Sequence, residues 1–168
     1  MNISLRPWHT DDLNELVEMA NNNHIAQYMA DVFPHPYGED NGKAFIEFAN
    51  SKTPPSIFAI LVDGKPAGSI GLHPQADILR KNSEIGYWLA EKHWGKGITV
   101  EAIKQIVEYG FKHLDVERIF ARIFGNNPAS QKAIIKAGFI QEGRFEKTIY
   151  KNGEFLDELI YATRKQKS

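Results

Sequence analysis

The chain has 168 residues, of which 42% are hydrophobic, a length and composition typical of one compact domain over residues 1–168. Its 20 lysines and arginines nearly balance 21 aspartates and glutamates, so no basic field exists to recruit nucleic acid or an anionic membrane. No apolar run reaches roughly 18 residues, and the first residues turn polar too early for a signal peptide. We therefore expect a cytoplasmic protein without a membrane span.

In the first half of the chain, Thr10 followed by two aspartates marks a helix start, and Asp63-Gly64 marks a hairpin turn. The elements predicted there are a strand over 3–6, a helix over 10–22, a proline-broken loop leading to a second helix within 31–49, and strands over 56–62 and 67–72.

In the second half, apolar residues recur on one helical face between Ile103 and Leu114, and Asn152-Gly153 marks another hairpin turn. The predicted elements are a strand over 84–89, the helix that carries this apolar face, a strand over 118–124, a helix over 128–137, and strands over 139–150 and 154–161. This order predicts the α/β fold class.

The absence of cysteine excludes a thiol nucleophile, a cysteine-based zinc site and disulfide bonds. The six histidines show no pair at the i, i+4 spacing of a helical metal site, so we predict no bound metal. Any acyl transfer must therefore be direct or use another nucleophile.

Gly95 and Gly97 stand immediately before the long amphipathic helix. A glycine turn that leads into a helix leaves backbone N–H groups unpaired and adds the positive end of the helix dipole, which favours a phosphate. Glycines also occur at such turns for conformational reasons alone. The Walker and dinucleotide-binding motifs both fail on spacing, because Ile98 and Val100 occupy positions that those motifs reserve for other residues.

A second block runs over residues 126–139. Asn127 suits a helix N-cap, Pro128 suits the first helical position, and Gly138 suits the helix C-terminus. Taken alone, these residues are also what any short helix needs at its ends. The two blocks together, in this order and roughly thirty residues apart, are a much more specific pattern than either alone.

These two blocks resemble the GNAT N-acetyltransferases, in particular the RimJ/RimL-like branch of ribosomal-protein acetyltransferases. The acyl-CoA signature of that family falls on residues 94–99, where Trp94 replaces Gln or Arg and Thr99 replaces a small residue. In the second block the matching positions are Asn127, Ser130, Lys136, Gly138 and Phe139.

The resemblance implies the GNAT fold, a single mixed, mostly antiparallel and splayed sheet flanked by helices. It also implies acetyl-CoA as cosubstrate, with the strand that ends at Leu89 offering backbone groups to the pantetheine arm. The other residues expected to hold the cofactor are Trp94, Gly95, Lys96, Gly97, Ile98, Thr99, Asn127 and Ser130.

Direct acetyl transfer needs a proton acceptor for the amine and an acid for the leaving thiolate. The tyrosine that many members of the family use as acid is Ile134 here, so the resemblance makes Ser130 the candidate acid. Glu84 is the candidate base, acting through water, and Tyr87 is the reserve candidate. The structural alternatives are a helix-capping serine, a glutamate that joins strand to loop, and a packing tyrosine.

The acceptor is expected between the loop over 30–40 and the last hairpin. Phe33, Tyr37 and Tyr150 could form its walls, and the loop acids Asp31, Glu39 and Asp40 could favour a cationic amine or be merely solvated. Protein N-termini, aminoglycosides, polyamines and amino acids remain open as acceptors. Exposed edges of the last hairpin could support a homodimer.

The sequence therefore predicts an acetyl-CoA-dependent N-acetyltransferase that acts on a primary amine. One alternative is a catalytically silent acyl-CoA-binding or regulatory module of the same fold, suggested by Ile134 and Thr99. A second alternative is a different nucleotide-binding protein.

Overall fold

The computed structural model describes residues 1–167. Within this range seven strands form one sheet: β1 (Ile3–Arg6), β2 (Ile57–Val62), β3 (Lys65–Pro74), β4 (Asn82–Leu89), β5 (Arg118–Phe124), β6 (Ile140–Lys151) and β7 (Glu154–Arg164). The α-helices are α1 (Leu13–Ala20), α2 (Asn23–Ala26), α3 (Glu39–Ala49), α4 (Ile98–His113) and α5 (Pro128–Lys136). Three short 3-10 turns, η1 (Thr10–Asp12), η2 (Asp77–Leu79) and η3 (Glu91–His93), complete the described elements.

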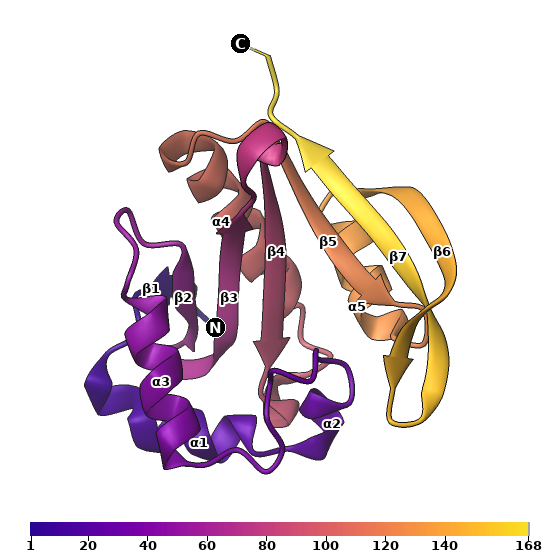
Figure 1. Ribbon diagram of the computed structural model, residues 1–168. Helices are drawn as coiled ribbons and strands as arrows, with labels where there is room; N and C mark the ends of the chain where they lie inside the picture. The colour runs from indigo at the N-terminus through magenta and orange to yellow at the C-terminus, as the bar shows by residue number, and fades with distance from the viewer. Residues whose placement is uncertain (168) are drawn as a thin grey trace.

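The strands lie in the order β1-β2-β3-β4-β5-β7-β6, and helices cover both faces of the sheet (Figure 1). All neighbouring strands are antiparallel except β4 and β5, which are parallel. The two strands are joined through α4, as a parallel pair requires. The predicted mixed, mostly antiparallel sheet flanked by helices is confirmed.

Both predicted hairpin turns are confirmed by their backbone angles. Asp63 and Gly64 have φ angles of 49° and 81°, and Asn152 and Gly153 have φ angles of 52° and 78°. Positive φ at both central residues is what a two-residue hairpin turn of the favoured twist requires, and Asn-Gly and Asp-Gly adopt it most readily.

Two hydrophobic clusters fill the space between the sheet and the helices, one on each face. On one face α4 contributes Ala102, Ile103 and Ile106, each 0% exposed. Gly110 of α4 approaches β3 so closely that a Cβ would stand 2.5 Å from Cδ1 of Leu72. On the other face α1 and α3 cover the second cluster (Figure 1). None of the helices in residues 1–167 is long and apolar enough to cross a membrane.

The first helix, predicted over 10–22, is shorter and interrupted in the structure. It consists of η1 followed by α1, which ends at Ala20. The Asp12 carboxylate accepts hydrogen bonds from the Arg6 guanidinium at 2.7 Å and from the His9 amide at 2.8 Å. Asp12 therefore links the start of α1 to β1. The three residues before α1 form the 3-10 turn η1 instead of a first α-helical turn.

The strand predicted over 139–150 begins one residue later, because Phe139 is 3% exposed and packs in the core. The pairing of β6 with β7 shifts register twice, between Gln141 and Gly143 and between Phe145 and Ile149. Bulges of this kind bend a strand and raise its twist.

Adjacent isoleucines on α5 give a matched test of the packing. Ile134 is 0% exposed, whereas Ile135 is 55% exposed. We expect Ile134→Ala to lower the free energy of unfolding by about 2–5 kcal/mol, because the lost methyl groups leave a cavity, and Ile135→Ala to change it by less than about 0.5 kcal/mol. Urea denaturation followed by circular dichroism measures both, and equal losses would contradict this packing.

Candidate functional site

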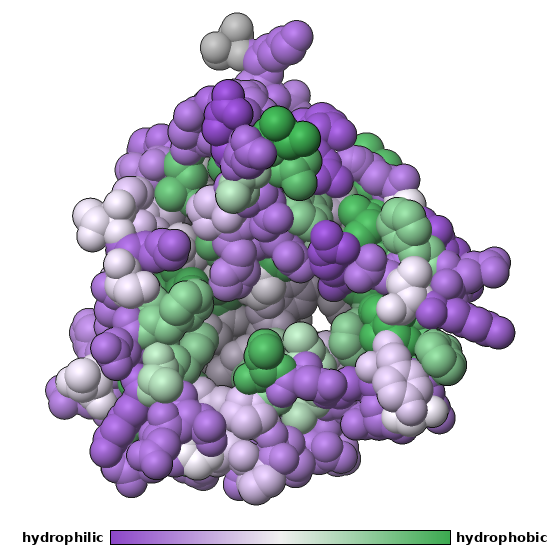
Figure 2. Space-filling model, in the orientation of Figure 1, coloured by the Kyte–Doolittle hydropathy of each residue, from purple (hydrophilic) through white to green (hydrophobic). Residues whose placement is uncertain are grey.

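The sheet opens between β4 and β5. The two strands pair over only three residues of β4, from Asn82 to Glu84, and then diverge. A cavity of about 900 Å³ occupies the opening, and Figure 2 shows the corresponding hollow at the centre of the molecule. We call it the central cavity. It is lined by β4, β5, α2, the first turns of α4 and α5, and the hairpin of β6 and β7.

The glycine turn forms one wall of the central cavity. Gly95 and Gly97 have φ angles of 73° and 77°, in the left-handed region that favours glycine. Gly97 is the N-cap of α4 and has no side chain that could accept a hydrogen bond. The amides of the first turn, which have no partner within the helix, are therefore also without a side-chain cap. Ile98, 1% exposed, anchors the turn in the core. The backbone geometry expected of an anion site is therefore present.

Trp94 and Lys96 attach this turn to the neighbouring chain. The Trp94 indole donates to the Leu89 carbonyl at 2.8 Å, which connects the turn to the end of β4. Leu89, expected to offer its backbone to a ligand, thus already uses its carbonyl within the protein. Lys96 donates from Nζ to the Lys92 carbonyl at 2.9 Å. Thr99 is partly buried and lines the cavity.

A tyrosine–serine pair joins β4 to α5 in the wall of the central cavity. The Tyr87 hydroxyl lies 2.7 Å from Oγ of Ser130. Asn127 caps α5, as predicted, by accepting a hydrogen bond from the Ser130 amide at 3.2 Å, and this fixes the first helical turn. Burial raises the pKa of Tyr87 to about 12, although the hydrogen bond with Ser130 opposes the rise. The phenol therefore stays protonated at neutral pH.

Glu84 lies on the opposite face of β4 from Tyr87, because successive strand residues alternate. Its carboxylate Oε1 is 3.6 Å from Nε of Arg122, and Nη1 of the same guanidinium is 3.2 Å from Oε1 of Glu158. Burial raises the pKa of Glu84, Arg122 lowers it and Glu158 raises it again. The two faces of β4 thus present different groups: the Tyr87–Ser130 hydroxyl pair on one face and the Glu84–Arg122 ion pair on the other.

Of the three aromatic residues expected to form acceptor walls, Tyr150 lines the cavity. It is 64% exposed and stacks on Phe155 with ring centroids 5.0 Å apart. Phe33 and Tyr37 instead pack together at 5.4 Å in the hydrophobic cluster under α1 and α3, and Tyr37 is 5% exposed. Neither residue is among those that line the central cavity, and their expected role as acceptor walls stays a prediction. The Tyr37 amide donates to Oδ1 of Asn21 at 3.0 Å, which folds this loop back onto the helices.

The acidic residues of the same segment also lie in two different places. Asp31 lines the cavity and accepts a hydrogen bond from Nζ of Lys151 at 2.8 Å, so it links the loop to the end of β6. Glu39 and Asp40 lie in the first turn of α3, away from the cavity-lining residues. Glu39 forms an exposed ion pair with Lys43 at 2.9 Å.

Sequence reasoning missed Arg122, Glu158 and Lys132, which line the central cavity. A usable signal existed for Arg122, since a charged residue in the middle of the apolar strand RIFARIF must face a cavity or a charged partner. The roles of Glu84, Tyr87 and the other predicted site residues remain predictions.

A family model described as an acetyltransferase (GNAT) domain matches residues 2–140. The chain belongs to the GNAT acetyltransferase family. Curated relatives of this GNAT protein include some named as ribosomal N-acetyltransferases. It is 39% identical over 95 residues to the uncharacterized N-acetyltransferase YoaA of Bacillus subtilis, a match that covers 56% of this chain and 53% of YoaA. The matches to YoaA and to two other curated relatives from Bacillus subtilis thus span between 53% and 58% of the relative's length.

Solved structures of the family superpose over nearly the whole chain. One of them is RimL, a ribosomal L7/L12 alpha-N-protein acetyltransferase in complex with coenzyme A. Its TM-score with this chain is 0.86 at 20% sequence identity, and the match covers 98% of this chain and 94% of the RimL chain. Another is the spermidine N-acetyltransferase from Vibrio cholerae, in complex with CoA and spermine. Its TM-score is 0.80 at 21% sequence identity, and the match covers 96% of this chain and 95% of the other chain. At such identities the likeness shows the fold.

Trp94 offers a test of how the turn is held. We expect Trp94→Phe to lower the free energy of unfolding by about 0.5–1.5 kcal/mol, because the ring is kept while the hydrogen bond to Leu89 is lost. Lys96→Met, which removes an exposed hydrogen bond in the same turn, should cost less than about 0.5 kcal/mol. Urea denaturation of both variants measures the difference, and an unchanged Trp94→Phe protein would contradict the assigned role.

Proposed function

We propose that this GNAT protein is an acetyl-CoA-dependent N-acetyltransferase that transfers the acetyl group directly to a primary amine. The observation that carries the proposal is the central cavity itself, which is lined by the glycine turn, by the Tyr87–Ser130 pair and by Glu84. An anion site, hydroxyl donors and a carboxylate with a raised pKa thus face one space. These are the groups that acyl transfer from a phosphorylated thioester to an amine needs.

The glycine turn fits the diphosphate of acetyl-CoA. A Cβ built at Gly95 or Gly97 would have nothing within 4 Å, so the space above the turn is open to a ligand. The free amides of residues 95–99 would hold the diphosphate, and Lys96 and Lys132 add positive charge along the same wall. Bound there, acetyl-CoA supplies the thioester carbonyl that the amine attacks.

Within this proposal, Glu84 accepts through a water molecule the proton that the attacking amine loses. The raised pKa of Glu84 makes it a stronger base than an ordinary glutamate. Ser130, held by Tyr87 and by the capped start of α5, donates a proton to the departing thiolate and regains one from solvent, to which Glu84 releases the proton that it accepted. Tyr87, expected as the reserve base, has a phenol that keeps its proton at neutral pH, so in this proposal it supports Ser130 as a proton donor.

The acceptor in this proposal is a protein N-terminus or a small-molecule amine. The similar structures named as ribosomal-protein and spermidine acetyltransferases represent these two classes. The carboxylates of Glu84, Glu158 and Asp31 line the central cavity, where they suit an amine that arrives as an ammonium ion. Tyr150 adds an exposed aromatic side chain to the same lining.

Calorimetric titration with acetyl-CoA tests the donor site. We expect micromolar binding by the wild type and a loss of at least about tenfold in Gly97→Asp, because a carboxylate repels the diphosphate. Gly64→Asp is the matched control, since Gly64 has a similar φ of 81° and open surroundings but lies in the distant hairpin of β2 and β3. No binding by the folded wild type would refute the proposal, and equal losses in both variants would indicate backbone strain instead.

Release of CoA in the presence of an amine panel tests the chemistry. The panel contains spermidine and peptides with free N-termini. We expect Glu84→Gln and Ser130→Ala each to lower kcat by about a hundredfold. In the wild type the rate should rise with pH through the raised pKa of Glu84, because only the carboxylate form accepts a proton, and this rise should vanish in Glu84→Gln. Unchanged turnover in both variants would refute the two assignments.

A catalytically silent acyl-CoA-binding module is the second candidate. Ile134, fully buried, occupies the position where many members of the family carry a tyrosine acid. Binding of acetyl-CoA without CoA release across the amine panel would support this candidate over the enzyme. Competition of ATP or NAD against acetyl-CoA would expose a different nucleotide specificity.

A further inference from the structure

Two carboxylates share one guanidinium in the wall of the central cavity. Arg122 reaches Glu84 through Nε at 3.6 Å and Glu158 through Nη1 at 3.2 Å. The side chains of Arg122, Glu84 and Glu158 are 50%, 33% and 18% exposed. They come from β5, β4 and β7, which are consecutive in the sheet, and all three line the cavity.

Strand register brings these groups together. Glu84 pairs with Phe120 of β5, and Arg122 lies two residues further along on the same face. The Arg122 guanidinium lies over the Phe120 ring, with its carbon 5.6 Å from the centroid. The aromatic face attracts the cation and limits where it can lie. Glu158 then reaches the same guanidinium from β7, beyond the point where β4 has diverged.

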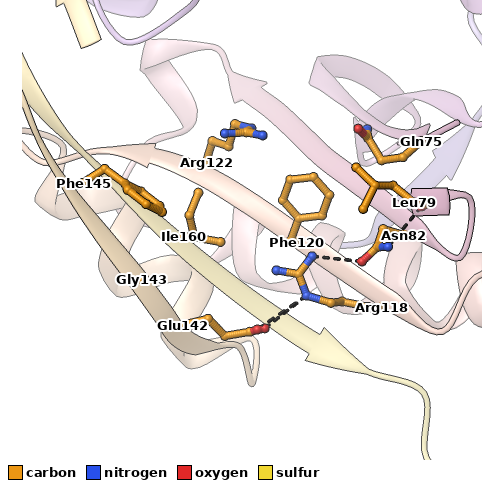
Figure 3. A pocket seen from close by; sticks show the side chains of 10 residues that line it. All are labelled: Gln75, Leu79, Asn82, Arg118, Phe120, Arg122, Glu142, Gly143, Phe145 and Ile160. Carbon is orange, nitrogen blue, oxygen red and sulfur yellow. Dashed lines mark hydrogen bonds and ion pairs between the residues drawn. The ribbon is translucent and has the colours of Figure 1, made fainter. Parts of the chain in front are cut away.

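Arg118 is a built-in comparison for Arg122. It stacks on the same Phe120 ring at 4.8 Å, but its guanidinium bonds to Glu142 at 3.1 Å and to Asn82 at 3.0 Å. Figure 3 shows these bonds, with Arg122 separate from them in the wall of a second cavity of about 360 Å³. The two arginines thus share their packing but differ in their carboxylate partners.

We propose that Arg122 and Glu158 are positioning residues that together set the charge of Glu84. This inference rests on the proposed function, in which Glu84 accepts a proton. The Arg122 guanidinium stabilises the carboxylate form of Glu84, whereas the Glu158 carboxylate repels it and competes for the same cation. Removal of Arg122 and removal of Glu158 therefore move the protonation of Glu84 in opposite directions.

The other titratable groups near Glu84 do not obscure this effect. His73 of β3 faces Glu84 in the strand pairing. Desolvation lowers the pKa of His73, and Lys52 lowers it further, so His73 is neutral at pH 7. Asp31, which also lines the cavity, is paired with Lys151. Arg122 and Glu158 are thus the charges that act on Glu84 near neutral pH.

The direct test is an NMR titration of the Glu84 side-chain carboxyl carbon in the free protein, with Glu84→Gln used to assign the signal. We expect the titration midpoint to rise in Arg122→Gln and to fall in Glu158→Gln. Arg118→Gln is the matched control and should leave the midpoint unchanged. Arg122→Lys, which keeps the cation, should restore most of the wild-type midpoint. Thermal unfolding by circular dichroism verifies that each variant is folded.

The same shifts should appear in turnover. On the acid side of the pH profile we expect kcat/KM, taken relative to its plateau in the same variant, to fall about threefold in Arg122→Gln and to rise about threefold in Glu158→Gln, the scale of a partly exposed ion pair. Shifts of equal sign, or no shift in a folded variant, would overturn the inference and make Arg122 a purely structural link. The titration needs no substrate, so failure of the proposed function would appear separately, as absence of wild-type turnover.

Discussion

The short parallel pairing of β4 with β5 creates the central cavity. The two strands start side by side and separate after Glu84. Beyond that residue the backbone donors and acceptors on the facing edges have no partner strand. Buried backbone groups must be satisfied, so water or a ligand has to occupy the opening. The sheet thereby creates a cavity that suits an extended, amide-containing ligand, and α4 and α5 cover one side of it.

The pleat of β4 places different chemical groups on the two faces of the strand. Tyr87 faces α5 and meets Ser130, while Glu84 faces the other way and meets Arg122. A strand places successive side chains on opposite faces, so three residues of one strand are enough to separate hydroxyl groups from charged groups. In the proposed reaction this separation keeps the acid for the leaving thiolate apart from the base for the amine.

The charged groups of this protein act at short range within the central cavity rather than through the net charge. The near balance of 20 basic and 21 acidic residues gives no overall field. Yet lysines line the cavity beside the glycine turn and α5, and carboxylates line it beside β4 and β7. At distances of a few ångströms in a partly desolvated space, such groups interact far more strongly than the net charge suggests. The arrangement suits a cavity that takes an anionic donor from one side and a cationic amine from the other.

Features that depend on local backbone chemistry could be predicted from the residues alone. The left-handed glycines of the turn, the Asn127 cap and the two hairpin turns each follow from a residue type that adopts one local conformation at little cost. The strand and helix order followed from hydrophobic periodicity, with errors at the ends, as where Asp12 bonds to β1. Family resemblance then linked these pieces to acyl-CoA.

The contacts between side chains that are distant in the sequence could not be predicted in this way, because they depend on how the whole chain folds. Tyr87 and Ser130 are 43 residues apart in the chain, and their contact depends on how α5 packs against β4. The triad of Arg122 with two glutamates depends on sheet order, in which β7 lies between β5 and β6. Phe33 and Tyr37 have the same aromatic chemistry as Tyr150, but their loop packs them into the hydrophobic cluster under α1 and α3, where Tyr37 is buried and Phe33 partly buried. The physical reason is that long-range register and packing are properties of the whole chain, which no local pattern specifies.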